Sequence, residues 1–484
     1  MSEKLPHGWV NAELSELAKV QSGGTPSRSN SRYWNGEIPW VKISDIKDLY
    51  VSETDEFITQ EGLDNSSTRI FPKGTILFTI FATIGRIGIL EIEATTNQAI
   101  AGITPSKFID SKYLTYSLLN LSIAIQGHGK GVAQKNINQS ILKSTLIPIP
   151  PLPEQKRIVA KLDALFGHLD TLKTKLDRIP ELLKNFRQQV LTQAVTGKLT
   201  EEWREGKELE ENGHNLLKRI LKERRKRYED QVTKAIESGI RKPKKLRGLD
   251  DEYKVDQVSD VPDSWSRTVV DKIGLVQVGA TPSRKENNYW NGQIPWVSSG
   301  EVANNRIIDT AERITDEGFR NSSVKLNSKG SVLIAMIGEG KTRGQSAILD
   351  IEACTNQNIA AVELNSNHVK SEYLWFHFLA NYEKNRSSGR GGNQPALNGK
   401  KIGEIFVNLP PLVEQDEIIK RVESLFDLAV KIESQYQSLK AKIDNLPQAI
   451  LNKAFKGELV DQDPNDEPAS ELLKRIQNEK GGKG

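Results

Sequence analysis

Two stretches of the chain carry apolar residues separated by alternating steps of three and four positions. The first stretch, between Pro153 and Gly197, has Leu162, Leu165, Leu169, Leu172, Leu176, Ile179, Leu183, Phe186 and Val190. The second has Val422, Leu425, Ala429, Ile432, Tyr436, Leu439, Ile443, Leu446 and Ile450. This spacing is that of a coiled-coil seam, so it predicts two long helices that pair with each other. Packing of each apolar stripe on its own globular domain is the alternative.

Each predicted helix contains a proline, Pro180 in the first and Pro447 in the second. Proline removes a backbone donor, and its ring clashes with the preceding turn of a helix. We therefore expect both helices to be kinked or divided at these residues.

The remaining sequence has short apolar or alternating runs, broken by Gly, Pro, Asn and Ser, that are typical of strands and turns. These runs include Ile38–Val41, Thr75–Ile80, Ile87–Leu90, Val332–Ile337 and Ala347–Leu349. Helices are predicted after Ser111 and Ser371, with each serine in the capping position. The two globular segments, called heads below, are thus predicted to be mainly β with some helix.

The chain is one unit written twice. Gly24-Thr-Pro-Ser-Arg28 returns as Ala280-Thr-Pro-Ser-Arg284, at an offset of 256 residues, and Glu154-Gln155 returns as Glu414-Gln415, at an offset of 260. The period is too long for a solenoid repeat, so each copy is predicted to be a head plus a helical spacer in an α+β fold. The predicted parts are a first head (1–150), a first helical spacer (151–200), a basic connector (201–259), a second head (260–409), a second helical spacer (410–460) and a C-terminal tail (461–484).

Composition narrows the class of protein. With 484 residues the chain is long enough for two to four domains, and no apolar run approaches the ~18 residues of a membrane span. The first residues resemble neither a secretory signal nor a transit peptide, so a cytoplasmic protein without a membrane contact is expected. One cysteine and six histidines without metal-ligand spacing argue against a disulfide or a metal site.

Three elements of each head could contact nucleic acid: the Gly/Pro turn, a Gly-Arg or Gly-Lys loop, and a glycine-rich basic loop followed by Gln and Asn. Glycines let a backbone approach phosphates, Lys and Arg supply charge, and Gln or Asn can pair with adenine edges. The candidate DNA-binding residues are Arg28, Arg86, Lys130, Gln134 and Asn138 in the first copy, and Arg284, Lys341, Arg343, Arg390, Gln394 and Asn398 in the second. An ordinary surface turn is the alternative for each single loop.

Other polar and aromatic groups have open roles. Tyr33, Trp34 and Trp40 fit the packing of a core or turn better than the stacking of bases. The Thr96-Asn-Gln98 and Thr355-Asn-Gln357 runs could bind either backbone or bases. The basic connector is predicted to be helical and then extended, and both it and the C-terminal tail are predicted to lie outside the heads. The connector is either a solvated linker or a contact for phosphates or partners.

Catalytic motifs are absent or incomplete. Ala335-Met-Ile-Gly-Glu-Gly-Lys-Thr342 satisfies a relaxed phosphate-loop pattern, but an apolar run follows it where a helix is required. No dinucleotide-binding glycine motif, amino-methyltransferase motif or nucleophile elbow occurs. The chain is therefore expected to perform no chemistry and to hold no cofactor or metal of its own.

These motifs together resemble the DNA-specificity subunit of type I restriction-modification enzymes over essentially the full length. Leu5-Pro-His-Gly-Trp9 and Val261-Pro-Asp-Ser-Trp265 open the two halves. Pro150-Pro-Leu-Pro-Glu-Gln155 and Pro410-Pro-Leu-Val-Glu-Gln415 open the two helices, and Phe186-Arg-Gln-Gln-Val-Leu191 is followed by Gly197-Lys-Leu199.

The resemblance implies two target-recognition domains that bind the halves of a bipartite, asymmetric target in double-stranded DNA. It implies that the two helices pair antiparallel as a pseudo-twofold duplication and set the spacer between the half-sites. It also implies partners: two modification subunits that bind S-adenosylmethionine and methylate adenine, and two restriction subunits that use ATP and Mg²⁺. A self-sufficient bivalent DNA-binding regulator and a coiled-coil scaffold remain the alternatives.

Overall fold

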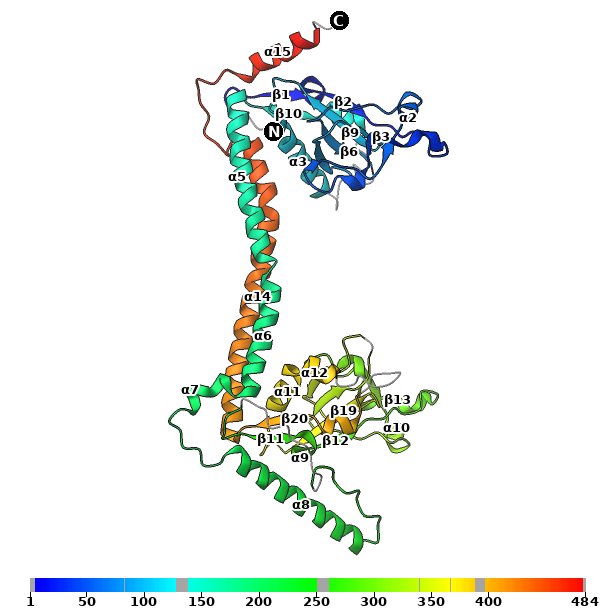
Figure 1. Ribbon diagram of the computed structural model, residues 1–484, viewed down its shortest axis with the longest axis vertical. Coiled ribbons are helices and arrows are strands. Elements are labelled where there is room, and N and C mark those ends of the chain that lie inside the picture. The colour runs from blue at the N-terminus through cyan, green and yellow to red at the C-terminus, as the bar shows by residue number, and fades with distance from the viewer. Residues whose placement is uncertain are drawn as a thin grey trace. The chain divides into compact units, whose positions relative to one another are not determined.

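The computed structural model describes residues 5–81, 83–127, 138–249, 261–338, 340–365, 367–387 and 397–481. It divides into two compact units, each of which is α+β as predicted (Figure 1). Unit 1 combines the chain up to Arg178 with the residues from Tyr436 onward, and unit 2 comprises Ile179–Gln435. Each unit holds one head.

Three sheets form head 1. Strand β1 (Val10–Glu13) pairs antiparallel with β10 (Leu146–Ile149). A five-stranded sheet has the order β2 (Ala18–Ser22), β9 (Ile100–Pro105), β6 (Ile76–Thr79), β7 (Ile87–Leu90) and β4 (Tyr50–Val51). A three-stranded sheet has the order β5 (Phe57–Ile58), β3 (Trp34–Val41) and β8 (Thr95–Thr96).

Head 2 repeats this topology strand for strand. Strand β11 (Ser266–Val269) pairs with β20 (Phe406–Leu409). The five-stranded sheet has the order β12 (Gly274–Val278), β19 (Ile359–Leu364), β16 (Val332–Ala335), β17 (Ser346–Leu349) and β14 (Asn305–Ile307). The three-stranded sheet has the order β15 (Glu312–Ile314), β13 (Trp290–Val297) and β18 (Cys354–Thr355). The duplication seen in the sequence is therefore a duplication of fold.

Buried apolar runs explain the central strands. All four residues of β6, β7, β16 and β17 are buried, because these strands lie inside the sheet with both faces covered. The predicted strands at these places and at β3 are confirmed. Short helices connect the strands: α1 (Leu14–Leu17), α2 (Gln60–Asp64), α4 (Gln139–Lys143), α9 (Val270–Ile273), α10 (Asp316–Arg320), α12 (Tyr382–Ser387) and α13 (Gly399–Gly403). Single 3₁₀ turns add η1 (Ser31–Tyr33), η2 (Ile43–Asp45), η3 (Lys198–Thr200), η4 (Asn287–Tyr289) and η5 (Ser299–Glu301).

The predicted helices after the two serines are α3 (Ser111–Gly127) and α11 (Ser371–Ala380). The predicted capping role of the serines is wrong. Both serines lie inside their helix, and the Ser371 hydroxyl donates to the Gly330 carbonyl at 2.5 Å. In head 1 the Asp110 carboxylate satisfies the helix start instead, accepting from the Tyr113 N–H at 3.0 Å.

The long helices are α5 (Leu152–Leu176), α6 (Ile179–Thr196) and α14 (Leu412–Phe455). The predicted break near Pro180 is confirmed by the division between α5 and α6. By contrast, α14 runs undivided through Pro447. One proline removes one helical hydrogen bond, and the buried residues Ile443 and Leu451 on either side hold α14 by packing.

Each unit contains antiparallel helices. In unit 1, Asp177, the C-cap of α5, pairs with Lys440 of α14 at 3.8 Å, while Leu162 shares a buried cluster with Leu451. In unit 2, Arg187 of α6 pairs with Glu433 at 2.8 Å. In η3, just beyond α6, the Leu199 carbonyl accepts from Arg421 of α14 at 2.9 Å. In both units the residue numbers rise along one helix as they fall along the helix that pairs with it. The two helices are therefore antiparallel.

Burial along the apolar stripes follows a seven-residue period. Leu162, Leu169, Leu176, Leu183 and Val190 are buried, as are Val422, Ala429, Tyr436 and Ile443. The intervening positions are less covered: Leu165 and Leu425 are half-buried, whereas Leu172, Ile432 and Leu439 are exposed. Each helix thus presents one row of core residues and a second apolar row toward solvent.

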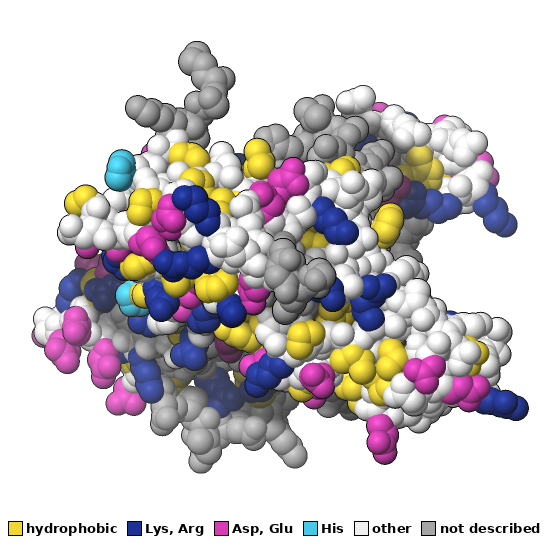
Figure 2. All heavy atoms as spheres, turned by 90° about the horizontal axis from the view of Figure 1, so that it is seen from above, with side chains coloured by type: hydrophobic (Ala, Val, Ile, Leu, Met, Phe, Trp, Pro, Cys, Tyr) yellow, Lys and Arg dark blue, Asp and Glu magenta, His cyan; other side chains and the backbone are white. Residues whose placement is uncertain are grey.

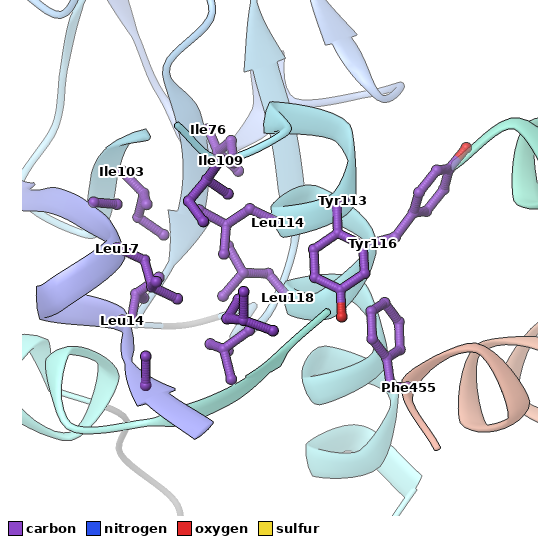
Figure 3. Close-up of a cluster of buried hydrophobic side chains, with 14 of the residues drawn as sticks. Leu14, Leu17, Ile76, Ile103, Ile109, Tyr113, Leu114, Tyr116, Leu118 and Phe455 are labelled. Atoms are coloured by element: carbon purple, nitrogen blue, oxygen red, sulfur yellow. The ribbon is translucent and has the colours of Figure 1, made fainter. Parts of the chain in front are cut away.

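The core of head 1 is completed by residues from the other copy. Phe455, at the end of α14, packs against Tyr113 of α3 with ring centroids 5.5 Å apart (Figure 3). Helix α15 (Ala469–Gly481) buries Leu472 and Ile476 in the same cluster. The C-terminal tail, set apart from the heads on sequence, supplies this helix to unit 1.

Head 2 is completed in the same way. Val190 and Leu191 of α6 are buried in its core, and α7 (Glu201–Arg204) follows. Helix α8 (Gly213–Glu237), the predicted helical part of the basic connector, buries Leu216 and Ile220 there. The repeated Leu-Leu-Lys-Arg-Ile block therefore packs on the head of the opposite copy in both units.

Candidate nucleic-acid interface

Several strands end at one edge of the five-stranded sheet, and the loops that connect them lie together there. In head 1, Ser22 ends β2 opposite Ala101, and Thr79 ends β6 opposite Ile100. Strand β7 begins opposite the end of β6, and the Asn97 N–H donates to the carbonyl of Val41, the last residue of β3, at 3.1 Å. Residues 23–30, 80–86 and 97–99, of which residue 82 is not described, therefore lie at this edge, called the loop edge below.

Hydrogen bonds tie these loops together. The Gly24 N–H donates to the Thr96 carbonyl at 2.8 Å, and the Thr25 hydroxyl donates to the Gln98 side chain. In head 2, the Ala280 N–H donates to the Thr355 carbonyl at 2.9 Å, and Thr281 donates to Gln357. The Thr-Asn-Gln runs thus brace the Gly/Pro turn, so their role is at least partly structural. The loop edge of head 2 comprises residues 279–286, 336–344 and 356–358, of which residue 339 is not described.

The arginines of the Gly/Pro turns are braced as well. The guanidinium of Arg28 lies 3.7 Å from the centre of the Trp34 ring and 2.6 Å from the Glu56 carboxylate. Arg284 repeats this arrangement with Trp290 and Glu312. The ammonium of Lys42, and then the guanidinium of Arg28, hold the pKa of Glu56 below its usual value against the effect of burial. Contact of these arginines with DNA stays a prediction.

The tryptophans beside the Gly/Pro turn pack on each other. Trp34 and Trp40 meet edge to face at 5.1 Å, and the Trp40 indole N–H donates to the Gly24 carbonyl at 2.9 Å. Trp290 and Trp296 have the same geometry. The interpretation of these rings as packing groups agrees with this arrangement, since their N–H groups are satisfied inside the head.

The other candidate residues differ in how they are presented. Arg86 is exposed, and its guanidinium donates to the Ile43 carbonyl at 3.2 Å. Lys341 is exposed, but Arg343 is only 9% exposed and so offers little surface to a ligand. Asn138 and Asn398 cap α4 and α13, where each side chain accepts from a backbone N–H at 2.9 Å. Lys130, Gln134, Arg390 and Gln394 lie outside the described residues.

A contact that sequence reasoning missed joins each head to its own helix. The Trp9 indole N–H donates to Glu154 at 3.0 Å, and the Trp265 N–H donates to Glu414 at 2.9 Å. The following glutamine is also bonded, since Gln155 accepts from the Asp110 N–H at 3.0 Å. The signal was present in the sequence, because the two motifs recur together. Their contact spans 145 residues in head 1, so spacing alone did not show it.

A second missed contact joins each head to the other copy. Gly197 follows α6 with φ +81°, and Gly457 follows α14 with φ +73°. A Cβ at Gly197 would clash with Pro262, and one at Gly457 would clash with Pro6. Glycine is required at both places because the backbone is left-handed and approaches the opposite head closely. The recurring Gly-x-Leu motif thus marks the place where the helical spacer of one copy contacts the head of the other.

The charge pattern and the motifs of the described residues restrict the functions that this surface can have. On the face that Figure 2 shows, Lys and Arg side chains lie among acidic and apolar ones and do not form one basic field. The relaxed phosphate-loop pattern leads from β16 into β17, so the helix that such a loop requires does not follow it. Within the described ranges, no group of His, Cys, Asp or Glu is arranged to hold a metal ion. None of the helices described is long and apolar enough to span a membrane.

Comparisons with known proteins agree on one family. The family model for the type I restriction modification DNA specificity domain matches residues 6–181 and 262–441. The chain is 25% identical to the EcoBI specificity subunit of Escherichia coli, over 98% of this chain and 93% of that protein. It is 27% identical to the EcoKI specificity subunit of Escherichia coli strain K12, over 99% of this chain and 97% of that protein.

A solved structure has the same fold. The HsdS subunit from Thermoanaerobacter tengcongensis superposes with a TM-score of 0.59 at 18% identity, covering 94% of this chain and 99% of that chain. Each segment matched by the family model holds one head and the first part of the helical region that follows it, one segment in each copy found in the sequence. The chain therefore belongs to the family of type I restriction modification DNA specificity domains.

Proposed function

We propose that this chain selects the DNA sequence on which a type I restriction-modification complex acts. The observation that carries the proposal is the pair of loop edges, built on one repeated scaffold and lined by different residues. A conserved scaffold with variable loops is the arrangement by which rigid sheets present recognition residues. The two heads are the target-recognition domains, and each loop edge binds one half of a bipartite site in double-stranded DNA.

The two half-sites have different sequences. The loop from β6 to β7 has seven residues between Thr79 and Ile87, whereas the loop from β16 to β17 has ten between Ala335 and Ser346. Arg86 stands in the first, and Lys341 in the second. Groups of different length and hydrogen-bonding pattern read different base edges. A perfect palindrome as the mapped target would contradict this assignment.

The helices serve as docking sites for partner subunits. Apolar side chains that need cover lie exposed along them: Leu172, Leu439 and Leu446 in unit 1, and Leu182, Leu428 and Ile432 in unit 2. The two exposed sets share one equivalent position, Leu172 and Ile432, which are 260 residues apart, and they suit two copies of one partner. We assign them to two modification subunits carrying S-adenosylmethionine, and two restriction subunits using ATP and Mg²⁺ join the same cytoplasmic complex.

Methylation provides the test. The purified chain alone should leave DNA unmethylated, and the chain with its modification subunits should methylate adenines within one bipartite sequence. Methylation by the isolated chain would contradict the proposal. Tight and specific binding without any modification subunit would favour the alternative, a self-sufficient regulator. Absence of salt-dependent DNA binding even with the subunits present would favour a scaffold.

The helices are also proposed to set the spacer. At ~1.5 Å per residue, the seam from Leu162 to Val190 is roughly 40 Å long, close to the ~34–36 Å of one turn of DNA. Deletion of one heptad from both spacers, 169–175 and 429–435, should shorten the preferred distance between half-sites and leave their bases unchanged. An unchanged spacer in the mapped target would exclude this role.

A further inference from the structure

Two pairs of exposed apolar residues stand at equivalent places in the two heads, Ile70 with Leu326 and Phe81 with Ile337, and of these the second pair lies on the loop edge. Phe81 and Ile337 are 256 positions apart and lie two residues beyond the ends of β6 and β16. Before them, Ile80 and Met336 are buried. The side chains of Phe81 and Ile337 then emerge, with 46% and 49% of their surface exposed. A single exposed apolar residue is ordinary, whereas Phe81 and Ile337 combine recurrence in both copies with a position on the loop edge.

Backbone hydrogen bonds fix the loop residues next to Phe81 and Ile337. The Ile80 N–H donates to the Ala99 carbonyl, and the Met336 N–H donates to the Asn358 carbonyl, each at 2.8 Å. On the other side of the loop, the Gly85 N–H donates to the Thr79 carbonyl at 2.9 Å. The side chains therefore project from a closed turn in the middle of the loop edge. A group held this way loses little conformational entropy when it binds.

The chemistry of DNA offers one apolar feature to such a side chain. In the major groove, hydrogen-bonding residues read the donors and acceptors of the bases, whereas the C5 methyl group of thymine is read by apolar contact. Arg86 and Lys341 in the same loops can supply polar contacts, but they cannot detect a methyl group. A ring in one head and a branched aliphatic chain in the other fit different neighbourhoods of that methyl.

We propose that Phe81 and Ile337 are specificity-determining residues, each contacting the C5 methyl group of a thymine in the half-site bound by its head. This inference rests on the proposed function and names what the loop edges read there. It requires an A·T pair in each half-site at the contacted position. It adds two residues that no pattern in the sequence marked as DNA-binding.

The test uses the full chain with its modification subunits and a duplex carrying the target mapped by methylation. Each thymine of one half-site is replaced singly by deoxyuridine, which removes only the methyl group. For the unaltered chain, one replacement should weaken binding about fourfold, the effect expected for one buried methyl-sized group. The Phe81→Ala variant should bind more weakly to the natural duplex and show no further loss at that thymine. Ile337→Ala should do the same for the other half-site.

Two exposed apolar residues outside the loop edges serve as controls. Leu146 is 60% exposed and pairs with Glu13, and Ile308 is 74% exposed and follows the pairing of Ile307 with Leu349. Their alanine variants should keep the full deoxyuridine response. Equal responses in Phe81→Ala and the unaltered chain would overturn the inference while leaving the proposed function intact. Failure of the unaltered complex to methylate any specific target would overturn both.

Discussion

At the residue scale, Glu154 and Glu414 occupy equivalent positions with unequal support. Both accept from a tryptophan indole N–H. Glu414 also accepts from the Thr200 hydroxyl at 2.7 Å and forms a buried ion pair with Arg204. Glu154 has no arginine at the matching place, and burial raises its pKa despite the bond from Trp9. The same motif residue is thus stabilised as a charge in unit 2 more fully than in unit 1.

The first prediction compares the two glutamates. Glu414→Gln should destabilise head 2 by about 3 kcal/mol, because Arg204 would keep its largely buried charge without an acidic partner. Glu154→Gln should cost about 1 kcal/mol or less, because no ion pair is lost. Hydrogen exchange in each head measures the two effects separately. Equal costs in the two heads would show that Arg204 contributes nothing.

A second residue-scale prediction concerns acid. Burial lowers the pKa of His377 from 6.5 to about 4, with smaller contributions from Lys384 and Arg267. Between these values the unfolded chain binds a proton that the folded chain excludes, so the stability of head 2 should fall as the pH falls from 6.5 to 4. The limit of this loss is about 3 kcal/mol.

Ser117 is the counterpart of His377 in head 1, and it shows a side chain that fits this place. His377→Ser should therefore remove the loss of stability between pH 6.5 and 4, whatever its effect at neutral pH. Unfolding by urea at a series of pH values measures the slope. A variant with the same slope as the unaltered chain would locate the acid sensitivity elsewhere.

Residue roles were predictable from sequence only where a pattern implied a partner. Trp34 and Trp40 were interpreted as packing groups of a core or turn, and both lie in β3 and pack on each other. The partner of Arg28, Glu56, lies in another part of the head, and nothing in the local sequence indicated it. Asn138 and Asn398 looked like base readers, although an Asn just before a short helix is also a common cap.

At the element scale, the two apolar rows of each long helix differ in burial and in role. Leu169 is buried, whereas Leu172, one step along the same predicted seam, is 45% exposed. The buried row holds the helix against its neighbour in the unit. The exposed row is available to another subunit.

These two leucines give the third prediction. Leu169→Ala should destabilise unit 1 by about 3 kcal/mol, because it removes a buried side chain and leaves a cavity. Leu172→Ala should change stability by less than about 0.5 kcal/mol, yet weaken assembly with the modification subunits. Thermal unfolding and sedimentation of the complex measure the two properties. Similar stabilities for the two variants would mean that both rows belong to the core.

The main elements could be read from sequence because long periodic or fully apolar runs leave few alternatives. The two-residue strands β4, β5 and β8 could not, since they exist only through pairing with distant strands. The break at Pro180 was predicted, but the same rule failed to divide α14 at Pro447. Packing on both sides of a proline can outweigh the loss of one hydrogen bond.

At the scale of the whole molecule, each head is completed by segments of the opposite copy. An apolar stripe shows that a helix needs a partner but does not say which surface will cover it. For this reason the contributions of α8 and α15 to the heads did not follow from their sequences. The repeated Leu-Leu-Lys-Arg-Ile blocks signalled a shared role, and the structure shows what that role is.

The fourth prediction removes one such segment. Ending the chain before Ala469 would expose the surface that Leu472 and Ile476 cover in head 1. Loss of these two buried side chains should cost several kcal/mol, on the order of 2–5 kcal/mol for each large apolar residue. Hydrogen exchange should rise in head 1 and stay constant in head 2. Lys474→Ala, at an exposed position of the same helix, is the control and should change neither.

Because each head is completed by segments of the opposite copy, synthesis on the ribosome determines which unit can fold first. Unit 2 is formed by one continuous stretch, Ile179–Gln435, and all of its parts are available once that stretch has emerged. Unit 1 needs residues from both sides of that stretch. The head that is translated first must therefore wait with an incomplete core while the head translated second finishes folding. For this protein, the usual order of domain folding, from the N-terminus onward, should be reversed.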